Sequence, residues 1–280
     1  RWAKDGRTLF FLSTRGGSPQ VWRIRTDGGE PLKLTSMPNG VNQYWWSADT
    51  SSVFVSSDVK WPDTTDLDRR HGAFPTSAQL WTDLFYRHWN EWRAGRRQPL
   101  FHVNLLNGRA TDITPIDHDV PTLALGGNDV AISPLGAELA VVYNADSSTA
   151  TSTNNDIFLV GPDGTGLVPM TDNRGNDHSP VYSPSARWIA YLSMATAGFE
   201  SDRQQVMLYD RATGERTSLT ADWDVSVQSM AWAPDSRSLV VEVEERGEHT
   251  LYRIAVAGGP PAPVATGGYN SGGQFLPRGA

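Results

Sequence analysis

The stretch YSPSARWIAYLS (182–193) decides the fold, because its pattern returns as WAPDSRSLVVEV (232–243). Each copy has an aromatic or apolar residue, a small residue, a Pro or polar residue, a turn and then a β-rich run. Three further copies are WAKDGRTLFFLS (2–13), WSADTSSVFVSS (46–57) and ISPLGAELAVVY (132–143). Repetition at a period of roughly 20–50 residues is typical of proteins in which one structural unit stacks on the next.

A second phrase follows each copy of the first and completes the repeat. It is a β-branched or aromatic strand, a Gly-containing turn, and a strand that closes on Thr or, in the last copy, Ala. The Asp-Gly, Asn-Gly, Thr-Gly and Gly-Gly pairs in these turns supply the positive φ values that tight hairpins require. Each repeat therefore predicts a four-stranded antiparallel meander. The five copies are VWRIRTDGGEPLKLT (21–35), LFHVNLLNGRATDIT (100–114), IFLVGPDGTGLVPMT (157–171), VMLYDRATGERTSLT (206–220) and LYRIAVAGGPPAPVA (251–265).

The repeats predict an all-β fold, a β-propeller of four-stranded antiparallel blades within a single domain over residues 1–280. About five blades are visible, the first without most of its innermost strand. The segment GGQFLPRG (272–279) matches the opening of a sixth, so we expect a fragment of a seven- or eight-bladed ring. A single blade cannot cover both of its faces, so its neighbours must. Large wedges between adjacent sheets explain the recurring aromatic residues Trp2, Trp46, Tyr182 and Trp232.

Composition excludes several classes of protein. The formal net charge of −7 argues against binding of nucleic acid, and the basic cluster of Arg93, Arg96 and Arg97 is interpreted as a solvated turn. The chain has no cysteine, which excludes disulfides and thiolate metal sites. No apolar run is long enough to span a membrane. The compartment stays open, with the periplasm or the outside of the cell favoured over the cytosol.

The second visible blade carries an insertion, residues 58–97. The copies that start at Trp46 and Ile132 are 86 residues apart, well beyond the spacing of the other repeats. Within the insertion, Pro75 and a capping-box pair precede a stripe of apolar and aromatic residues at helical spacing, and Gly95 follows it. We expect a helix of about 16 residues here. Its stripe is expected to pack on the propeller, and a partner domain or ligand is the alternative. The stripe residues are Trp81, Leu84, Phe85, His88, Trp89 and Trp92.

The chain shows no self-sufficient active site. It lacks the G-x-S-x-G motif of a nucleophile elbow, and its six histidines have no metal-ligand spacing. No metal or cofactor is therefore expected. The loops that contain His118 and Asp177 precede blade starts and could reach a ligand at the central channel, but hydrogen-bonded turn residues are the favoured interpretation.

The repeats SPLGAELAVVYN, SPSARWIAYLSM and APDSRSLVVEVE resemble those shared by TolB and prolyl-oligopeptidase-family serine peptidases. The inserted LFYRHWNEWRAGRRQPLFHVNLLNG is similar to the insertion of dipeptidyl peptidases of the acylaminoacyl-peptidase kind. The resemblance implies a non-catalytic propeller that gates access to a separate C-terminal α/β-hydrolase domain, absent from this chain. It also implies that short peptides are the substrates and that insertion residues help to hold their N-terminus. A homo-oligomer is possible in such a family.

An ammonium group favours a carboxylate in a poorly solvated place, so the resemblance makes Glu91 and then Asp83 the candidates for holding it. Tyr86, Arg87 and Trp89 complete the candidate substrate-binding set. The paired glutamates of the best-known amine-binding insertions are missing here. On the expected helix, Glu91 would also lie one turn from Arg87, which makes a surface ion pair the alternative role.

Two other classes of protein compete with the peptidase propeller. A TolB-like scaffold would bind other proteins without chemistry, and it would have short, regular connections between blades. A sugar-processing propeller would need convergent carboxylates or arginines at the channel, and the sequence shows no such set. The insertion is therefore the segment that separates these hypotheses.

Overall fold

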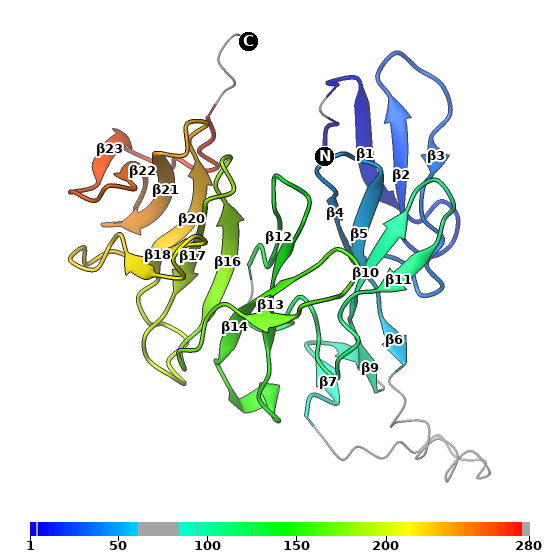
Figure 1. Cartoon of the computed structure of the whole chain (residues 1–280), viewed down its shortest axis with the longest axis horizontal. Coiled ribbons are helices and arrows are strands. Elements are labelled where there is room, and N and C mark those ends of the chain that lie inside the picture. Colours follow the sequence, from blue (N-terminus) through cyan, green and yellow to red (C-terminus); the bar gives the residue numbers. More distant parts are fainter. Residues whose placement is uncertain (4, 61–83, 94, 126, 276–280) are drawn as a thin grey trace.

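A computed structural model of the chain describes residues 1–280 except 4, 61–83, 94, 126 and 276–280. The described residues form five antiparallel sheets that follow one another in an arc from the N-terminal to the C-terminal end (Figure 1). Two short strand pairs and one turn of 3-10 helix, η1 (Thr149–Thr151), complete the regular structure. No α-helix occurs among the described residues.

The five sheets confirm the predicted blades. The first has three strands, as expected for a blade without its innermost strand, and the other four have four strands each. The first sheet is β1 (Thr8–Ser13), β2 (Gln20–Arg25) and β3 (Leu32–Lys33). The second is β4 (Gln43–Trp46), β5 (Ser52–Ser56), β10 (Leu100–Asn104) and β11 (Ala110–Asp112).

The remaining three sheets run in chain order without interruption. The third sheet is β12 (Val130–Ile132), β13 (Leu139–Asn144), β14 (Asn155–Val160) and β15 (Val168–Pro169). The fourth is β16 (Asp177–Tyr182), β17 (Trp188–Ser193), β18 (Gln205–Asp210) and β19 (Arg216–Ser218). The fifth is β20 (Val227–Trp232), β21 (Ser238–Glu245), β22 (Glu248–Ala255) and β23 (Ala262–Ala265).

The hydrophobic core lies between neighbouring sheets. Strand β13 is buried along its whole length because both of its faces are covered. Val141 and Tyr143 pack with Phe54 of the second sheet, whereas Val142 packs with Tyr191 of the fourth. Successive side chains of a strand point to opposite faces, so one strand supplies two interfaces. Stacking of neighbouring sheets therefore buries the faces that a lone blade would expose, as predicted.

The turn between the first two strands has the same geometry in all five repeats. The turn residue that is fifth in each repeat copy has a positive φ. Its amide donates to the carbonyl of the residue three positions earlier, at 2.8–3.1 Å. Left-handed backbone is favourable for glycine and costly for other residues. Three repeats nevertheless use another residue here. The five residues are Gly6, Thr50, Gly136, Ala186 and Ser236.

The predicted aromatic wedges pack to different extents. Tyr182 is buried and Trp232 is half-buried, and the indole Nε1 of Trp232 donates to the carbonyl of Val181 in the neighbouring sheet at 3.0 Å. Trp46 lies against Phe10, with ring centroids 3.9 Å apart. Trp2 is 63% exposed, so it is not a wedge in this structure.

Candidate functional site

The insertion leaves the second sheet after β5 and returns at β10, the second and third strands of that sheet. In an antiparallel meander, this connection lies at the same end as the loops that lead from one sheet to the next. The loops that precede β12 and β16 are of that kind. The insertion therefore shares a face of the propeller with the loops around His118 and Asp177, and Figure 1 shows its strands below the second sheet.

The expected helix is wrong for the described part of the insertion. Residues 84–97 contain three two-residue strands: β7 (Arg87–His88), β8 (Glu91–Trp92) and β9 (Arg96–Arg97). Strand β7 pairs with β8 in a hairpin, and β9 pairs with β6 (Val59–Lys60) at the base. The start of the expected helix, with Trp81 and Asp83, lies outside the described residues.

A two-residue turn at Trp89 and Asn90 explains the hairpin. Trp89 has a φ of 48°, which a helix does not allow. The amide of Arg93 donates to the carbonyl of Tyr86 at 3.1 Å and extends the strand pairing beyond β7 and β8. The rings of Tyr86 and Trp92 stack across the turn, with centroids 6.1 Å apart. The aromatic spacing that suggested one helical face therefore also suits contacts between two strands.

The aromatic stripe is largely exposed rather than packed, so the expectation that it packs on the propeller is wrong for most of its described residues. Exposure is 83% for Trp89, 60% for Trp92 and 55% for Leu84. Phe85 differs, because it lines a small cavity together with Asp119 and the neighbouring loops of the third sheet. The hairpin thus contacts the propeller at Phe85 and presents large apolar side chains to solvent.

The register of the hairpin separates Glu91 from Arg87. His88 lies opposite Glu91, and Arg87 lies opposite Trp92, so the two pairs face opposite sides of the ladder. Among the described residues no ion pair joins Arg87 to Glu91, and Arg87 Nη1 instead donates to the Trp89 carbonyl at 3.4 Å. The surface ion pair expected from helical spacing is therefore absent.

The residue opposite Glu91 belongs to a small group of aromatic rings. The ring of His88, which lies opposite Glu91, is 5.9 Å from that of Phe85 and 6.1 Å from that of Trp89. Glu91 itself is exposed. Carboxylates and aromatic faces are both groups that attract an ammonium ion. The hairpin thus places Glu91 opposite His88, whose ring contacts that of Trp89 from the candidate set, and places Arg87 on the other side of the ladder.

The base of the insertion is tied to the loop that precedes β12. Arg93 Nη2 donates to Asp119 Oδ1 at 2.5 Å, and Arg97 Nε donates to Asp117 Oδ1 at 2.7 Å. Burial raises the pKa of Asp119, and the Arg93 guanidinium acts in the opposite direction. The prediction of a solvated basic turn is therefore wrong for Arg93 and Arg97. The sequence shows the basic cluster but gives no sign of its acidic partners.

His118, Asp177 and His178 lie in or next to the other connections on this face. His178 bonds Ser179 Oγ and Gln204 Oε1 at 3.0 and 3.1 Å, and burial lowers its pKa to about 4. His118 stacks on Tyr143, with centroids 5.6 Å apart. Asp177 is the first residue of β16; its Oδ2 accepts Asn173 Nδ2 at 2.7 Å, but its Oδ1 is buried and has no hydrogen-bond partner among the described residues. The interpretation as hydrogen-bonded turn residues is therefore met only in part. Within the described ranges, no cluster of three or more His, Cys, Asp or Glu could hold a metal ion.

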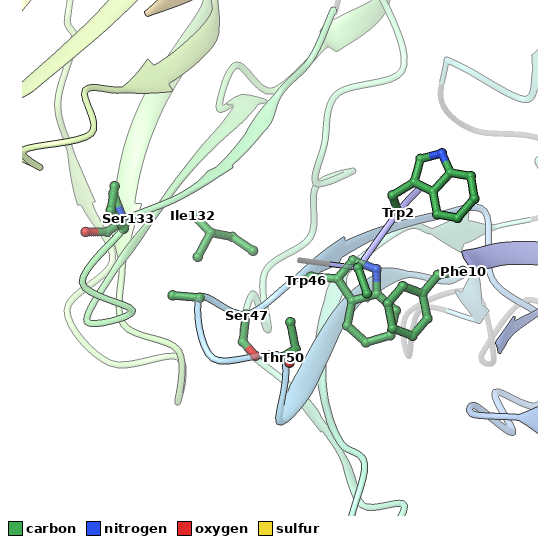
Figure 2. A pocket seen from close by; sticks show the side chains of 10 residues that line it. Trp2, Phe10, Trp46, Ser47, Thr50, Ile132 and Ser133 are labelled. Atoms are coloured by element: carbon green, nitrogen blue, oxygen red, sulfur yellow. The ribbon is translucent and has the colours of Figure 1, made fainter. Parts of the chain in front are cut away.

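A larger cavity of about 270 Å³ lies on the other face of the propeller, between the first, second and third sheets. Figure 2 shows Trp2, Phe10 and Trp46 on one side of it, and Ile132 and Ser133 on the other. Trp46 Nε1 is buried and has no partner among the described residues, although the equivalent Trp232 donates to the neighbouring inner strand. The cavity therefore lies where the first sheet has only a Trp2–Leu9 bridge in place of its inner strand.

Solved structures define the class of this fold. The chain is similar to the acylaminoacyl peptidase of Pyrococcus horikoshii, with a TM-score of 0.67 and 14% identity over 95% of this chain and 38% of that one. It is also similar to a putative TolB from Agrobacterium tumefaciens, with a TM-score of 0.58 and 14% identity over 94% of this chain and 78% of that one. Both likenesses show the propeller fold.

Sequence relatives narrow the class. The chain is 30% identical to dipeptidyl-peptidase 5 of Porphyromonas gingivalis over 95% of this chain and 40% of the relative. No family model matches the chain. These relatives and solved structures match the chain to a propeller domain of the prolyl-oligopeptidase family. The chain spans about 40% of the length of that relative. Among its described residues, no helix could cross a membrane.

Proposed function

We propose that this propeller gates access to a separate α/β-hydrolase domain and positions the free N-terminus of short peptides for cleavage there. The relatives that are named dipeptidyl-peptidases are more than twice as long as the matched region, which leaves room for such a domain. The observation that carries the proposal is the hairpin of residues 84–93. It places Glu91 opposite His88, whose ring contacts the exposed ring of Trp89, on the face where the loops between blades gather.

Glu91 is the residue that binds the substrate ammonium in this proposal, and Trp89 supplies an aromatic wall. The hairpin supports this role because Arg87, which a helix would have placed one turn from Glu91, faces the other side of the ladder, and Arg93 is paired with Asp119. Tyr86 stacks on Trp92 and thereby supports the pairing of the two strands. Asp83 belongs to the candidate set but lies outside the described residues.

The test uses the full-length protein and two matched substrates, a dipeptidyl substrate with a free amine and the same substrate with an acetylated amine. Glu91→Gln should raise KM for the free-amine substrate about tenfold, equivalent to about 1.4 kcal/mol, and leave the acetylated substrate unchanged. Glu215→Gln, an exposed glutamate at a turn of the fourth sheet, is the control. Equal KM values for the wild type and Glu91→Gln would remove Glu91 from the site. Hydrolysis of the free-amine substrate by the full-length protein also distinguishes this proposal from a TolB-like scaffold, which would hydrolyse neither substrate.

A further inference from the structure

The hairpin that holds Glu91 cannot fix its own orientation. Its strands β7 and β8 have two residues each, and an isolated two-stranded hairpin is at best marginally stable in water. Its large side chains Leu84, Trp89 and Trp92 are more than half exposed, so they bury little apolar surface. The direction in which the turn points must therefore be set by contacts at the base of the hairpin.

Arg93 makes the most buried of these contacts. Its side chain is 11% exposed and that of its partner Asp119 is 20% exposed. Arg93 Nη2 also donates to the carbonyl of Arg96 at 3.0 Å, and Asp119 Oδ1 accepts a second bond from the amide of Gln98 at 2.7 Å. One carboxylate thus joins the end of the hairpin, the returning strand and the loop that leads to β12.

The second ion pair at the base is a weaker anchor. Arg97 and Asp117 have side chains that are 31% and 49% exposed, and solvated pairs contribute little because water screens them. A buried carboxylate, in contrast, is strongly disfavoured without its counter-charge. Asp119 therefore holds Arg93 in one place far more firmly than Asp117 holds Arg97.

We propose that Arg93 and Asp119 are positioning residues, which fix Glu91 in the orientation that receives the substrate ammonium. Arg93 follows Glu91 by two residues, and its amide closes the hairpin on Tyr86. A displacement at Arg93 is therefore transmitted to Glu91 through two residues of extended backbone. This inference rests on the proposed function, because it assigns the means by which that site is held.

The test is a double-mutant cycle in the full-length protein with the free-amine and acetylated substrates. Arg93→Met should raise KM for the free-amine substrate about tenfold, because a misplaced Glu91 carboxylate loses its contact with the substrate ammonium. The kcat for this substrate and the KM for the acetylated substrate should not change. In a Glu91→Gln background the same substitution should raise KM no further. Arg97→Met, which removes the exposed pair, should change KM less than about twofold.

Three outcomes would overturn the inference: an additive effect of Arg93→Met on Glu91→Gln, an equal loss with the acetylated substrate, or an unchanged KM in Arg93→Met. An unchanged KM in Glu91→Gln would instead overturn the proposed function. Arg93→Lys keeps the charge but not the paired donors, so it serves if Arg93→Met does not fold. Arg93→Lys should raise KM for the free-amine substrate less than Arg93→Met does. In the Glu91→Gln background it should raise KM no further.

Discussion

The hydroxyl of Thr171 illustrates why four of the five repeats close on threonine. Thr171 Oγ1 accepts the amide of Ile157, in the neighbouring strand β14, at 2.9 Å and donates to Asp156 Oδ1 at 2.9 Å. The closing threonine of every other repeat that has one accepts the equivalent amide at 2.8–2.9 Å. The other three pairs are Thr35 with Val21, Thr114 with Leu100, and Thr220 with Val206.

Thr171→Val should destabilise the fold although valine has nearly the same shape. Thr171 is 2% exposed, so the substitution leaves a buried amide and a buried carboxyl without this hydroxyl. An unsatisfied buried donor costs about 1–3 kcal/mol, and loss of the Asp156 bond brings the total to about 2–4 kcal/mol. For a chain of this length the melting temperature should fall by about 4–8 °C.

Urea unfolding followed by tryptophan fluorescence measures this change. Thr171→Ser keeps the hydroxyl and should recover most of the stability, because only a methyl group is lost. Thr220→Val removes the equivalent backbone bond from the fourth sheet and should cost about 1–3 kcal/mol. If Thr171→Val unfolds at the wild-type urea concentration, the hydroxyl does not hold the strand and the explanation of the repeat is wrong.

Two further predictions concern pH and backbone strain. Burial raises the pKa of Asp177 from 3.8 to about 6, so its protonated form stabilises the fold and this contribution is lost as the pH rises from about 4 through about 6. Asp177→Asn should therefore remove up to about 3 kcal/mol of that decline when unfolding is measured between pH 4 and 7.5; an unchanged pH profile would contradict the assignment. Thr50 has a φ of 60°, so Thr50→Gly should stabilise by about 0.5–1 kcal/mol, and Gly136→Ala in the equivalent turn should destabilise by a similar amount, as read from thermal unfolding. If Thr50→Gly and Gly136→Ala change the stability in the same direction, the backbone-strain explanation is refuted.

The sequence was sufficient to predict the blades because the strand pattern and the turn residues of each repeat independently indicate the same four-stranded meander. The turn before Trp188 and its counterparts have one geometry, although Ala186 and Ser236 replace the glycine. The insertion has no second copy against which to check a pattern. Its aromatic spacing predicted a helix, and the positive φ at Trp89, which accompanies the hairpin turn instead, has no signal in the sequence.

The candidate site was predictable only in part. The resemblance selected the insertion and Glu91, but the helical geometry assigned the wrong neighbour, Arg87, to that carboxylate. Which residues face each other across a hairpin depends on the position of its turn, and a shift of one residue reverses every side chain. The partnership of Arg93 with Asp119 joins segments that are 26 residues apart, and no local pattern indicates it.

The pairing of the two strands that carry the insertion does not depend on the insertion's length. The pairing of β5 with β10 runs without a gap from Leu100 opposite Ser56 to Asn104 opposite Ser52, as if a short turn joined the two strands. The excursion between them is about 43 residues long, and closing such a loop costs about 3 kcal/mol more than a two-residue turn. The sheet gains nothing from that length in its own hydrogen bonding. Strand pairing therefore sets no limit on the length of the insertion, and its position is set instead by the ion pairs of Arg93 with Asp119 and of Arg97 with Asp117.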